Sequence, residues 1–534
     1  MTAPPPAFQM GSREKNLEQL RRQTLDVLIL GGGINGAGIA RDLALRAKLA
    51  RKPLLLGLVE QRQFASGTSG RNSQLIHGGL RYLKNFEFGL VREALQERAT
   101  LMRIAPHLVE PLPMIMPMYG LAPRLYYGAG LWLYDLLAGR RNVGRRRYLS
   151  RKKLGEIEPK LLADGLHSAA VFYDCRVHSA RLVLENLFDA ARDGAAIANY
   201  VKAVDIVAEG DRFRVEVKDT LRGPSYFIRA RKVVDARGPW EEGGSIRLVR
   251  GSHLVLPRVN SSDNAIAHFG ADGRILFIIP WGPENRLSLI GTTDIDHEGG
   301  AEDVRISRAE IEYLYDAAAA LFPGVREAKP LAAYSSLRPL LMEEGKSATE
   351  TSRGHRIWFG ADGLLHIGGG KYTTYRAMSE EAATMLARQA ALPLVEPAPT
   401  GTTGLGGNSP ASQQRLLRET DRMLAQYALG EAELRRVIRH YGLQTENVLA
   451  LAPVKGPEGL TRLECAVVQY AFRHEMAQRL ADLLFVSTYW GYEQQWSEER
   501  LKRLATYVAT MTGWDAARID EEIGLVRRLT AFPA

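Results

Sequence analysis

A short apolar strand, a glycine-rich turn and the start of a helix follow one another early in the chain, and this order restricts the fold more than any other feature. Residues 26–30 read as the buried strand, and the turn GGGINGAG at 31–38 opens the helix. Gly31 allows the tight turn, Gly33 lets the backbone approach a pyrophosphate, and Gly36 permits close packing of the helix. Free N–H groups in the first helical turn favour a bound anion. The pattern predicts a dinucleotide-binding unit of the Rossmann type.

An acidic residue after a second strand strengthens this prediction. Residues 54–59 form the expected strand, and Glu60 follows it where a carboxylate can bind ribose hydroxyls. Asn35, inside the glycine turn, is a further candidate for contact with the nucleotide. A glycine turn alone can serve only the backbone, but the strand, the helix and the acidic residue together favour nucleotide binding.

Length and composition are those of an ordinary globular protein. The 534 residues are 46% hydrophobic and 24% charged, which suits two or three domains with a large core. Cys175 and Cys465 are too few for a disulfide framework or a cysteine metal site, so we expect a reducing cytosol and no metal. Residues 1–24 start with a proline run and lack an apolar core, which predicts a flexible leader rather than a signal peptide.

The net charge of +10 has a local concentration. An apolar, aromatic stretch at 125–134 comes before a cluster of basic residues: Arg140, Arg141, Arg145, Arg146, Arg147, Arg151, Lys152 and Lys153. An aromatic amphipathic segment beside basic residues is typical of a protein that lies on an anionic membrane surface. A buried cap helix followed by a solvated basic loop is the alternative. No RNA-binding signature accompanies the charge, so we expect no nucleic-acid partner.

Periodicity and helix-breaking residues divide the rest of the chain. Helices are predicted at 88–102 and 181–192, and strands at 212–217, 225–229, 248–256, 275–280 and 287–291. Later segments are helical, including 413–429, 464–485 and 498–511. The predicted fold is α/β (α+β overall): a Rossmann-like binding domain, an antiparallel sheet that caps the substrate site, and a helical C-terminal domain. The predicted boundaries are 1–24 leader; 25–85, 165–245 and 332–396 binding domain; 86–164 and 246–331 cap; 397–411 linker; and 412–534 C-terminal domain.

The ordered motifs resemble those of the FAD-dependent glycerol-3-phosphate dehydrogenase family, within the glycine/D-amino-acid oxidase type of flavoprotein. The resemblance runs from residue 26 to about residue 374, with a looser likeness in the helical C-terminal part. Its motifs are GGGINGAGIA at 31–40, LIHGGLRYL at 75–83, YDC at 173–175, ARLV at 180–183, GSH at 251–253, IPW at 279–281, IGTTD at 290–294, YSSLRPL at 334–340 and GGGKYTTYR at 368–376.

The resemblance implies a flavoenzyme with non-covalent FAD that oxidises sn-glycerol 3-phosphate to dihydroxyacetone phosphate. A hydride is expected to pass from C2 to flavin N5, and the electrons to a membrane quinone, either ubiquinone or menaquinone. The expected location is cytoplasmic, peripheral on the inner face of the cytoplasmic membrane, and a homodimer is left open. Alternatives are an oxidase that uses oxygen, a flavoenzyme of the same fold for another alcohol or amine, and a catalytically silent nucleotide-binding scaffold.

Chemistry and resemblance together assign the site residues. A phosphate dianion needs fixed cations, so Arg81, Arg338 and Lys371, with Tyr82 beside them, are the substrate-binding candidates. Removal of the C2 hydroxyl proton needs a base, and both His77 and His253 are candidates, whereas Lys371 can instead polarise the oxygen. Arg338 and Lys371 therefore join the two histidines as expected catalytic residues. The expected FAD-binding residues are Gly31, Gly33, Asn35, Gly36, Glu60, Thr68, Ser69, Gly238, Gly369, Gly370, Thr373 and Thr374.

Two positions depart from the family pattern. Where members often carry lysine before the LIH block, this chain has Gln74, so one expected cation is missing. The usual Ala-Thr-Gly turn reads Ala236-Arg237-Gly238 here, and Arg237 can either reach FAD or point to solvent. Neither departure removes a residue that is assigned to chemistry.

Overall fold

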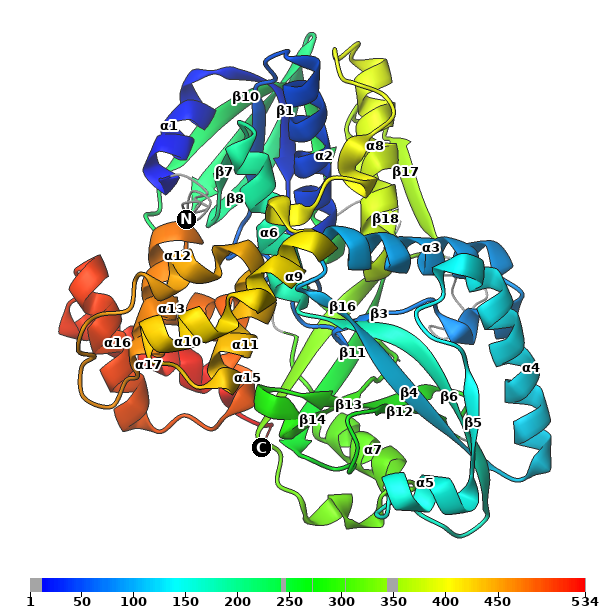
Figure 1. The fold of residues 1–534 in the computed structure, drawn as a ribbon. Helices are drawn as coiled ribbons and strands as arrows, with labels where there is room; N and C mark the ends of the chain where they lie inside the picture. Colours follow the sequence, from blue (N-terminus) through cyan, green and yellow to red (C-terminus); the bar gives the residue numbers. More distant parts are fainter. Residues whose placement is uncertain (1–11, 242–245, 271, 303, 343–353, 534) are drawn as a thin grey trace.

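Two β-sheets and a helical unit make up the molecule (Figure 1). A computed structural model describes residues 12–241, 246–270, 272–302, 304–342 and 354–533. In the view of Figure 1 the first sheet lies above the second, and the C-terminal helices gather at one side of both. The predicted class, a mixed α/β fold with a helical C-terminal domain, is confirmed.

The first sheet has a parallel centre. Its strands run, in spatial order, β17 (His355–Phe359), β18 (Leu365–Gly369), β10 (Ser225–Asp235), β1 (Thr24–Leu30), β2 (Leu56–Val59) and β7 (Ala196–Ala198), with β9 (Arg212–Asp219) and β8 (Val201–Glu209) added beside β10. Strand β1 is apolar along most of its length because both of its faces are covered. Val27 and Ile29 pack with the helices on one face, whereas Leu28 and Leu30 pack on the other.

Helices cover both faces of the first sheet. On one face, α2 (Ile34–Ala50) starts directly after the glycine turn and packs against α6 (Ser179–Arg192) and α8 (Tyr375–Gln389). On the other face, α1 (Arg13–Arg22) buries Leu17 and Leu20 against β1 and the β8–β10 strands. The helix predicted at 181–192 and the strands predicted at 212–217 and 225–229 are confirmed.

Helix α1 corrects the prediction of a flexible leader over residues 1–24. The Arg13 side chain is buried, donates from Nε to the Asn199 carbonyl at 3.0 Å and pairs with Asp219 at 3.1 Å. Two leucines on the same helix face reach the core, and the helix is therefore held by tertiary packing rather than by its own propensity. The prediction is wrong for residues 13–22, and residues 1–11 lie outside the described part.

The second sheet is mostly antiparallel and contains the strands predicted at 248–256, 275–280 and 287–291. Its order is β15 (Ile295–Asp296), β11 (Ile246–Pro257), β14 (Leu287–Gly291), β13 (Ile275–Trp281), β12 (Ala265–Phe269), β4 (Val109–Tyr119), β6 (Leu166–Val177) and β3 (Leu75–Ile76), with β16 (Ala332–Leu341) beside β11 and β5 (Arg147–Ser150) beside β6. The helices of this region are α3 (Phe88–Ile104), α4 (Leu121–Ala138), α5 (Arg151–Ile157) and α7 (Arg308–Ala319).

Three strands lie in a different sheet from the one that the predicted boundaries imply. Strands β3, β6 and β16 fall within the ranges assigned to the binding domain, but β6 pairs along its length with β4, and β16 with β11. The alternation of apolar residues is the same whichever strand lies alongside, so sequence order could not identify these partners. The chain therefore passes repeatedly between the two sheets. As a result, residues of both sheets line one cavity.

The C-terminal domain is helical, as predicted. Its helices are α9 (Pro410–Arg418), α10 (Thr420–Tyr427), α11 (Glu431–Tyr441), α12 (Thr445–Leu449), α13 (Arg462–His474), α14 (Leu480–Asp482), α15 (Trp490–Glu493), α16 (Glu498–Thr512) and α17 (Ala516–Thr530). The single helix predicted at 464–485 is interrupted, because α13 ends at His474 and Met476 takes a left-handed φ of 54°.

The segment predicted as a linker, 397–411, is packed against the first domain. Thr400 and Leu405 are buried. The Thr400 hydroxyl donates to Asp42 of α2 at 3.2 Å, and the Gly406 N–H donates to Asp189 of α6 at 3.2 Å. The prediction of a linker fails here because Thr400 and Gly406 satisfy polar groups on two helices.

Candidate active site

A cavity of about 390 Å³ is lined by residues of both sheets. Its walls come from the turn after β1, the loop after β2, the end of β10, the strands β11, β13 and β16, and the turn after β18. The carboxyl ends of β1, β2 and β10 meet at this cavity, which is where nucleotides bind in doubly wound sheets.

The glycine turn brings bare backbone to the cavity wall. Gly31 has a left-handed φ of 107°, and a Cβ added there would lie 2.5 Å from the Ala236 carbonyl oxygen. A Cβ on Gly36 would lie 2.0 Å from the Gly31 oxygen, so the first turn of α2 packs directly on the glycine turn. Gly33 and Asn35 line the cavity, whereas Gly36 lies behind it.

Glu60 stands at the end of β2 and lines the cavity. Its Oε2 accepts the Gly32 N–H at 2.7 Å, and its Oε1 accepts the Arg62 N–H at 2.9 Å. Burial raises the pKa of Glu60, while these two N–H groups act in the opposite direction. The carboxylate is thus fixed in orientation, with lone pairs left for ribose hydroxyls.

The loop that follows β2 closes over the glycine turn. Thr68 and Ser69 both line the cavity. The Thr68 hydroxyl donates to the Leu337 carbonyl of β16, and Ser69 Oγ accepts the Ile34 N–H at the start of α2, at 2.9 Å. These contacts hold one wall of the nucleotide site against β16 and the start of α2.

The turn after β18 forms another part of the wall. Gly369, Gly370 and Lys371 line the cavity, as does Gly238 after β10. Thr373 and Thr374, expected to contact FAD, are not among the lining residues. Thr373 Oγ1 instead accepts the His77 N–H and lies 3.2 Å from the His77 carbonyl, and Thr374 Oγ1 lies 3.4 Å from the Lys371 carbonyl. Their hydroxyls therefore support the wall from behind.

The residues present fit FAD. The bare glycine turn and the N-terminus of α2 suit a pyrophosphate, and the fixed carboxylate of Glu60 suits a ribose. From there the cavity continues to β11 and β16, where His253 and Arg338 line it. A dinucleotide held at one end would place its other end beside these charged and titratable side chains.

His253, on β11, is buried beside the cavity. Its Nε2 lies 2.8 Å from Ser73 Oγ, and its ring stacks on Tyr334 at 5.0 Å between centroids. Burial, and then the positive charge of Arg338, lower the pKa of His253 to about 3. The imidazole is neutral at physiological pH. Gly291 leaves room for it, since a Cβ there would lie 2.2 Å from the ring.

The other histidine and two of the substrate candidates line the same cavity. His77, Tyr82 and Lys371 all line the cavity. Lys371 Nζ lies 3.8 Å above the centre of the Tyr82 ring, a distance typical of a cation–π contact. The side chain of Arg81 lies outside the described part of the molecule.

Arg338, on β16, is held by the turn of the IGTTD motif, whose Thr292 and Asp294 were not assigned to the site from the sequence. Its Nη1 donates to Asp294 at 2.8 Å and to the Thr293 carbonyl at 3.0 Å, and Nη2 donates to Thr292 Oγ1 at 2.7 Å. Asp294 and Thr292 also line the cavity. The available signal was the polar run TTD directly after an apolar strand, at 292–294.

Asp174 is a second carboxylate that lines the cavity and was not chosen from the sequence. It pairs with Arg98 at 2.6 Å, and it accepts the Tyr134 hydroxyl at 2.7 Å and the Gly78 N–H at 3.1 Å. It therefore fixes the backbone next to His77. Its position within the YDC motif was the only signal.

Gln74 and Arg237, the two departures from the family pattern, both form hydrogen bonds with neighbouring residues. Gln74 is buried, and its Oε1 accepts the N–H and the hydroxyl of Ser179 at 3.0 Å each. Arg237 lines the cavity and donates to both oxygens of Asp235, at 3.0 and 2.7 Å. Arg237 thus neutralises a carboxylate at the end of β10 rather than pointing freely to solvent.

Comparison with known proteins extends over the whole fold. The profile of the family described as FAD dependent oxidoreductase matches residues 26–376, and that of the C-terminal domain of alpha-glycerophosphate oxidase matches residues 400–519. Glycerol-3-phosphate dehydrogenase 2 of Mycobacterium bovis is 33% identical over 97% of this chain and 90% of its own. The aerobic glycerol-3-phosphate dehydrogenase of Staphylococcus saprophyticus is 31% identical over 89% and 88%.

A solved structure is similar over nearly the full length. The glycerol-3-phosphate dehydrogenase from Bacillus halodurans, complexed with FAD, superimposes with a TM-score of 0.79 at 28% identity. The match covers 98% of this chain and 97% of that chain, so both sheets and the helical domain are shared.

Proposed function

The chain belongs to the family of FAD-dependent glycerol-3-phosphate dehydrogenases, and we propose that it oxidises sn-glycerol 3-phosphate to dihydroxyacetone phosphate and passes the electrons to a membrane quinone. The observation that carries the substrate assignment is the pair of cations, Arg338 and Lys371, that lines one cavity with a nucleotide-binding turn. FAD, when bound, supplies the acceptor for the hydride that leaves C2.

Arg338 is suited to hold the substrate phosphate. Asp294 and Thr292 fix the plane of its guanidinium, so a phosphate meets a fork that is already oriented. Asp294 also neutralises one positive charge, and a dianion therefore needs a second cation nearby. Lys371 lines the same cavity and serves as that cation.

We infer that His77 rather than His253 is the base for the C2 hydroxyl proton. An effective base has a pKa near the working pH, whereas burial and Arg338 hold the pKa of His253 at about 3. His253 also shares Nε2 with the Ser73 hydroxyl. We assign His253 to hydrogen bonding in its neutral form. His77, with its backbone held by Thr373, is assigned to proton removal.

Anaerobic mixing with glycerol 3-phosphate tests the reaction. The absorbance of oxidised flavin should be bleached, and glycerol should be a poor substrate because the phosphate-binding cations would remain unpaired. The expected loss in kcat/KM is at least about 100-fold, from roughly 3 kcal/mol. Comparable efficiency on glycerol and glycerol 3-phosphate would exclude this substrate class.

Two matched variants test the base. His77→Asn should slow anaerobic flavin reduction by about 100-fold or more, with little change in the binding of substrate. His253→Asn keeps a polar group beside Ser73 and should reduce the rate less. If His77→Asn reduces flavin at the rate of the unmodified protein, His77 is not the base.

Helix α4 supports the membrane part of the proposal. Its buried side holds Leu131, Tyr134 and Ala138. Four of its five large exposed apolar side chains recur at helical spacing, which places them along one face: Leu121, Leu125, Trp132 and Leu136. The fifth, Tyr126, lies beside this face. Within the described residues, no helix is long and apolar enough to cross a membrane. The stripe is therefore proposed to lie in the membrane surface, as interfacial helices do.

Basic residues flank this stripe. Arg140, Arg141, Arg145 and Arg147 follow α4 and are exposed, whereas Arg146 pairs with Asp135 at 2.8 Å. Each exposed basic residue near an anionic surface contributes about 1 kcal/mol to binding. The alternative of a wholly buried cap helix does not account for the exposed stripe.

A matched pair of charge reversals tests the docking surface. Arg145→Glu with Arg147→Glu should reduce binding to anionic vesicles at least tenfold and lower electron delivery to vesicle-embedded quinone. Arg415→Glu with Arg418→Glu, on exposed α9, changes the charge equally at another site and should have little effect. Activity with a soluble dye should stay unchanged in both. Equal vesicle binding by the two double variants would contradict docking through α4.

Oxygen is the second candidate acceptor, because the profile that matches residues 400–519 is named after an oxidase. Oxygen consumption during turnover without quinone distinguishes the two. Slow oxygen use that quinone accelerates supports the dehydrogenase. Oxygen use at the full rate, with no quinone effect, supports the oxidase.

A further inference from the structure

The loop after β2 forms one wall of the FAD cavity and is held from outside. Residues 65–69, 72 and 73 line the cavity. Strand β16 holds the loop at two carbonyls: the Tyr334 hydroxyl donates to Asn72 O at 2.7 Å, and the Ser336 hydroxyl donates to Arg71 O at 2.6 Å. The backbone between these anchors and Ser69 includes Gly70.

Gly70 is held by the C-terminal domain. The hydroxyl of Tyr489 donates to the Gly70 carbonyl oxygen at 2.8 Å, although these residues are 419 positions apart. The same hydroxyl oxygen accepts the Ala180 N–H at 3.1 Å and lies 3.0 Å from Ser179 Oγ, both at the start of α6. The hydroxyl of Tyr489, in the C-terminal domain, therefore contacts both the loop after β2 and the start of α6 in the first domain.

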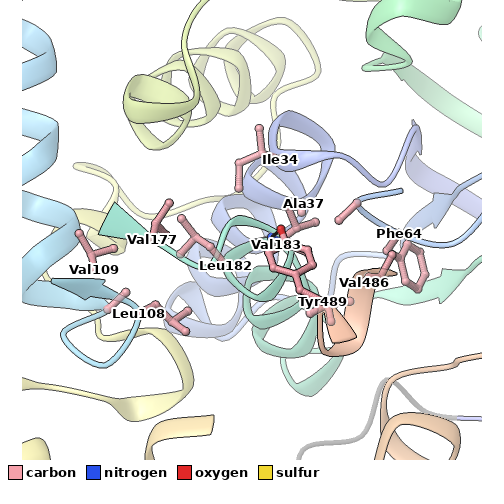
Figure 2. Close-up of a cluster of buried hydrophobic side chains, with 14 of the residues drawn as sticks. Ile34, Ala37, Phe64, Leu108, Val109, Val177, Leu182, Val183, Val486 and Tyr489 are labelled. Atoms are coloured by element: carbon pink, nitrogen blue, oxygen red, sulfur yellow. Dashed lines mark hydrogen bonds between the residues drawn. The ribbon is translucent and has the colours of Figure 1, made fainter. Parts of the chain in front are cut away.

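Tyr489 has a rigid position in the core. It is 1% exposed, with a left-handed φ of 70°, and its ring stacks on His178 at 4.0 Å between centroids. Figure 2 shows it on the C-terminal segment, among Val183 of α6, Ala37 of α2 and Phe64 of the loop. A buried ring of this kind has little freedom to move, so its hydroxyl is a fixed point for the loop.

A second aromatic contact connects the C-terminal domain to the part of the cavity that holds His253. Tyr492, on α15, lies 4.9 Å from the Tyr334 ring, which in turn stacks on His253. The C-terminal domain thus backs both the loop and the strand that carry cavity residues.

We propose that the C-terminal domain completes the FAD site from outside, with Tyr489 as the positioning residue that holds the loop at 65–73 in its FAD-binding conformation. The physical basis is preorganisation: if the loop is loosened, FAD binding must order it, and affinity falls by that cost. This inference rests on FAD as the cofactor and does not depend on the proposed substrate or acceptor.

Tyr489→Phe tests the proposal, since it keeps the stacked ring and removes only the hydroxyl. We expect the Kd of FAD for the apoprotein, measured by flavin fluorescence, to rise about fivefold or more. Activity should recover at saturating FAD. Hydrogen exchange should accelerate in the peptide that contains residues 65–73 and remain unchanged in strand β1.

Tyr441→Phe is the matched control. Tyr441 is buried in the same domain, and its hydroxyl has no hydrogen-bond partner within the described residues. Its loss should leave the Kd of FAD unchanged. If Tyr489→Phe does not fold, Ser179→Ala, which removes one partner of the phenol, should raise the Kd in the same direction.

Two outcomes would overturn the proposal. One is a Kd for FAD within twofold of the unmodified protein while the melting temperature falls, because Tyr489 would then only stabilise the fold. The other is an equal rise in Kd for Tyr441→Phe, because the effect would then belong to the domain in general.

Discussion

At the scale of single residues, Arg338 shows how closely the site is built. Its guanidinium passes over Gly251 on the neighbouring strand, and a Cβ added to Gly251 would lie 2.3 Å from Nη2. Thr292 and Asp294 hold the other side of the group. The guanidinium therefore occupies space that a side chain at position 251 would enter, so its position depends on glycine there.

Gly251→Ala should displace Arg338 without changing any charge. Loss of a charge-assisted contact to phosphate is expected to raise the KM for glycerol 3-phosphate by roughly 10- to 100-fold. The Kd of FAD should not change. Steady-state kinetics and flavin titration measure both, with Gly324→Ala as control because a Cβ there meets open space. An unchanged KM would exclude Arg338 from the substrate site.

His366, on β18, gives a pH-dependent contribution to stability. Its Nδ1 lies 3.2 Å from Glu241, and its Nε2 lies 3.1 Å from Asp362. The contact with Glu241 raises the pKa of His366, burial lowers it, and Asp362 and Asp235 raise it further. The net result is a pKa of about 9. The protonated form is therefore favoured in the folded state.

Because the folded pKa exceeds the unfolded value, this stabilisation is fully present below about pH 6.5 and is lost as pH rises through 9. We expect the melting temperature of the protein to fall over that range more steeply than that of His366→Gln. Thermal melts at pH 6, 7.5 and 9 compare them. Parallel curves for the two proteins would show that His366 makes no such contribution.

At the scale of elements, a buried carboxylate joins the strands that carry the site. Glu310 of α7 accepts from Ser252 Oγ of β11 at 2.7 Å and from Thr293 Oγ1 after β14 at 2.8 Å. It also accepts from the Ser307 N–H at 2.9 Å and pairs with Arg250 at 3.0 Å. One side chain thus connects the strand of His253 to the turn that holds Arg338.

Glu310→Gln should destabilise this junction by roughly 1–3 kcal/mol, because an amide NH₂ would face groups that donate. Burial raises the pKa of Glu310, but hydrogen bonds from Ser307, Ser252 and Thr293 outweigh it and lower the pKa. The stabilisation is present above about pH 4.5 and is lost as pH falls through the folded pKa. Urea unfolding at pH 7 and pH 4 should show the difference between variant and unmodified protein shrinking in acid. A constant difference would contradict this account.

At the scale of the whole molecule, a buried ion cluster joins the C-terminal domain to the first domain. Arg181 of α6 is fully buried and pairs with Glu185 of its own helix and with Glu475, just after α13. His107 lies 3.0 Å from the same Glu185, and the Tyr441 ring lies 4.7 Å from the guanidinium. Charges of this kind are costly when one partner is lost.

Arg181→Ala should therefore leave two buried carboxylates without their cation and lower the free energy of unfolding by about 3–5 kcal/mol. Arg435→Ala, which removes an exposed pair with Glu431, should cost no more than about 1 kcal/mol. Urea unfolding measures both. Similar losses in the two variants would show that the cluster does not hold the domains together.

Because Tyr489 reaches Gly70 across the same interface, FAD binding should weaken in Arg181→Ala as well.

Local patterns were sufficient for the elements whose shape depends on neighbouring residues. The strand, glycine turn and helix at 26–38 follow from sterics within a few residues, and Glu60 follows from the end of the next strand. Amphipathic periodicity was enough for α3 and α6. Strand β4 was not recognised from the sequence, because Pro111, Pro113 and Pro117 argue against a regular strand. In the structure these prolines are separated by even numbers of residues, so the N–H groups that they lack would all point to the same side of the strand.

The sequence alone was sufficient to predict the nucleotide-binding unit, the helical C-terminal part and the residue types of the site. These features depend on short-range sterics and periodicity. Only the tertiary structure decided the contacts that orient them: Arg338 with Asp294, 44 positions apart, His253 with Ser73, 180 apart, and Tyr489 with Gly70, 419 apart. The physical reason is that an alternating strand is compatible with many partners, and the choice among them is made when two sheets and the helical domain pack together and bury their common faces.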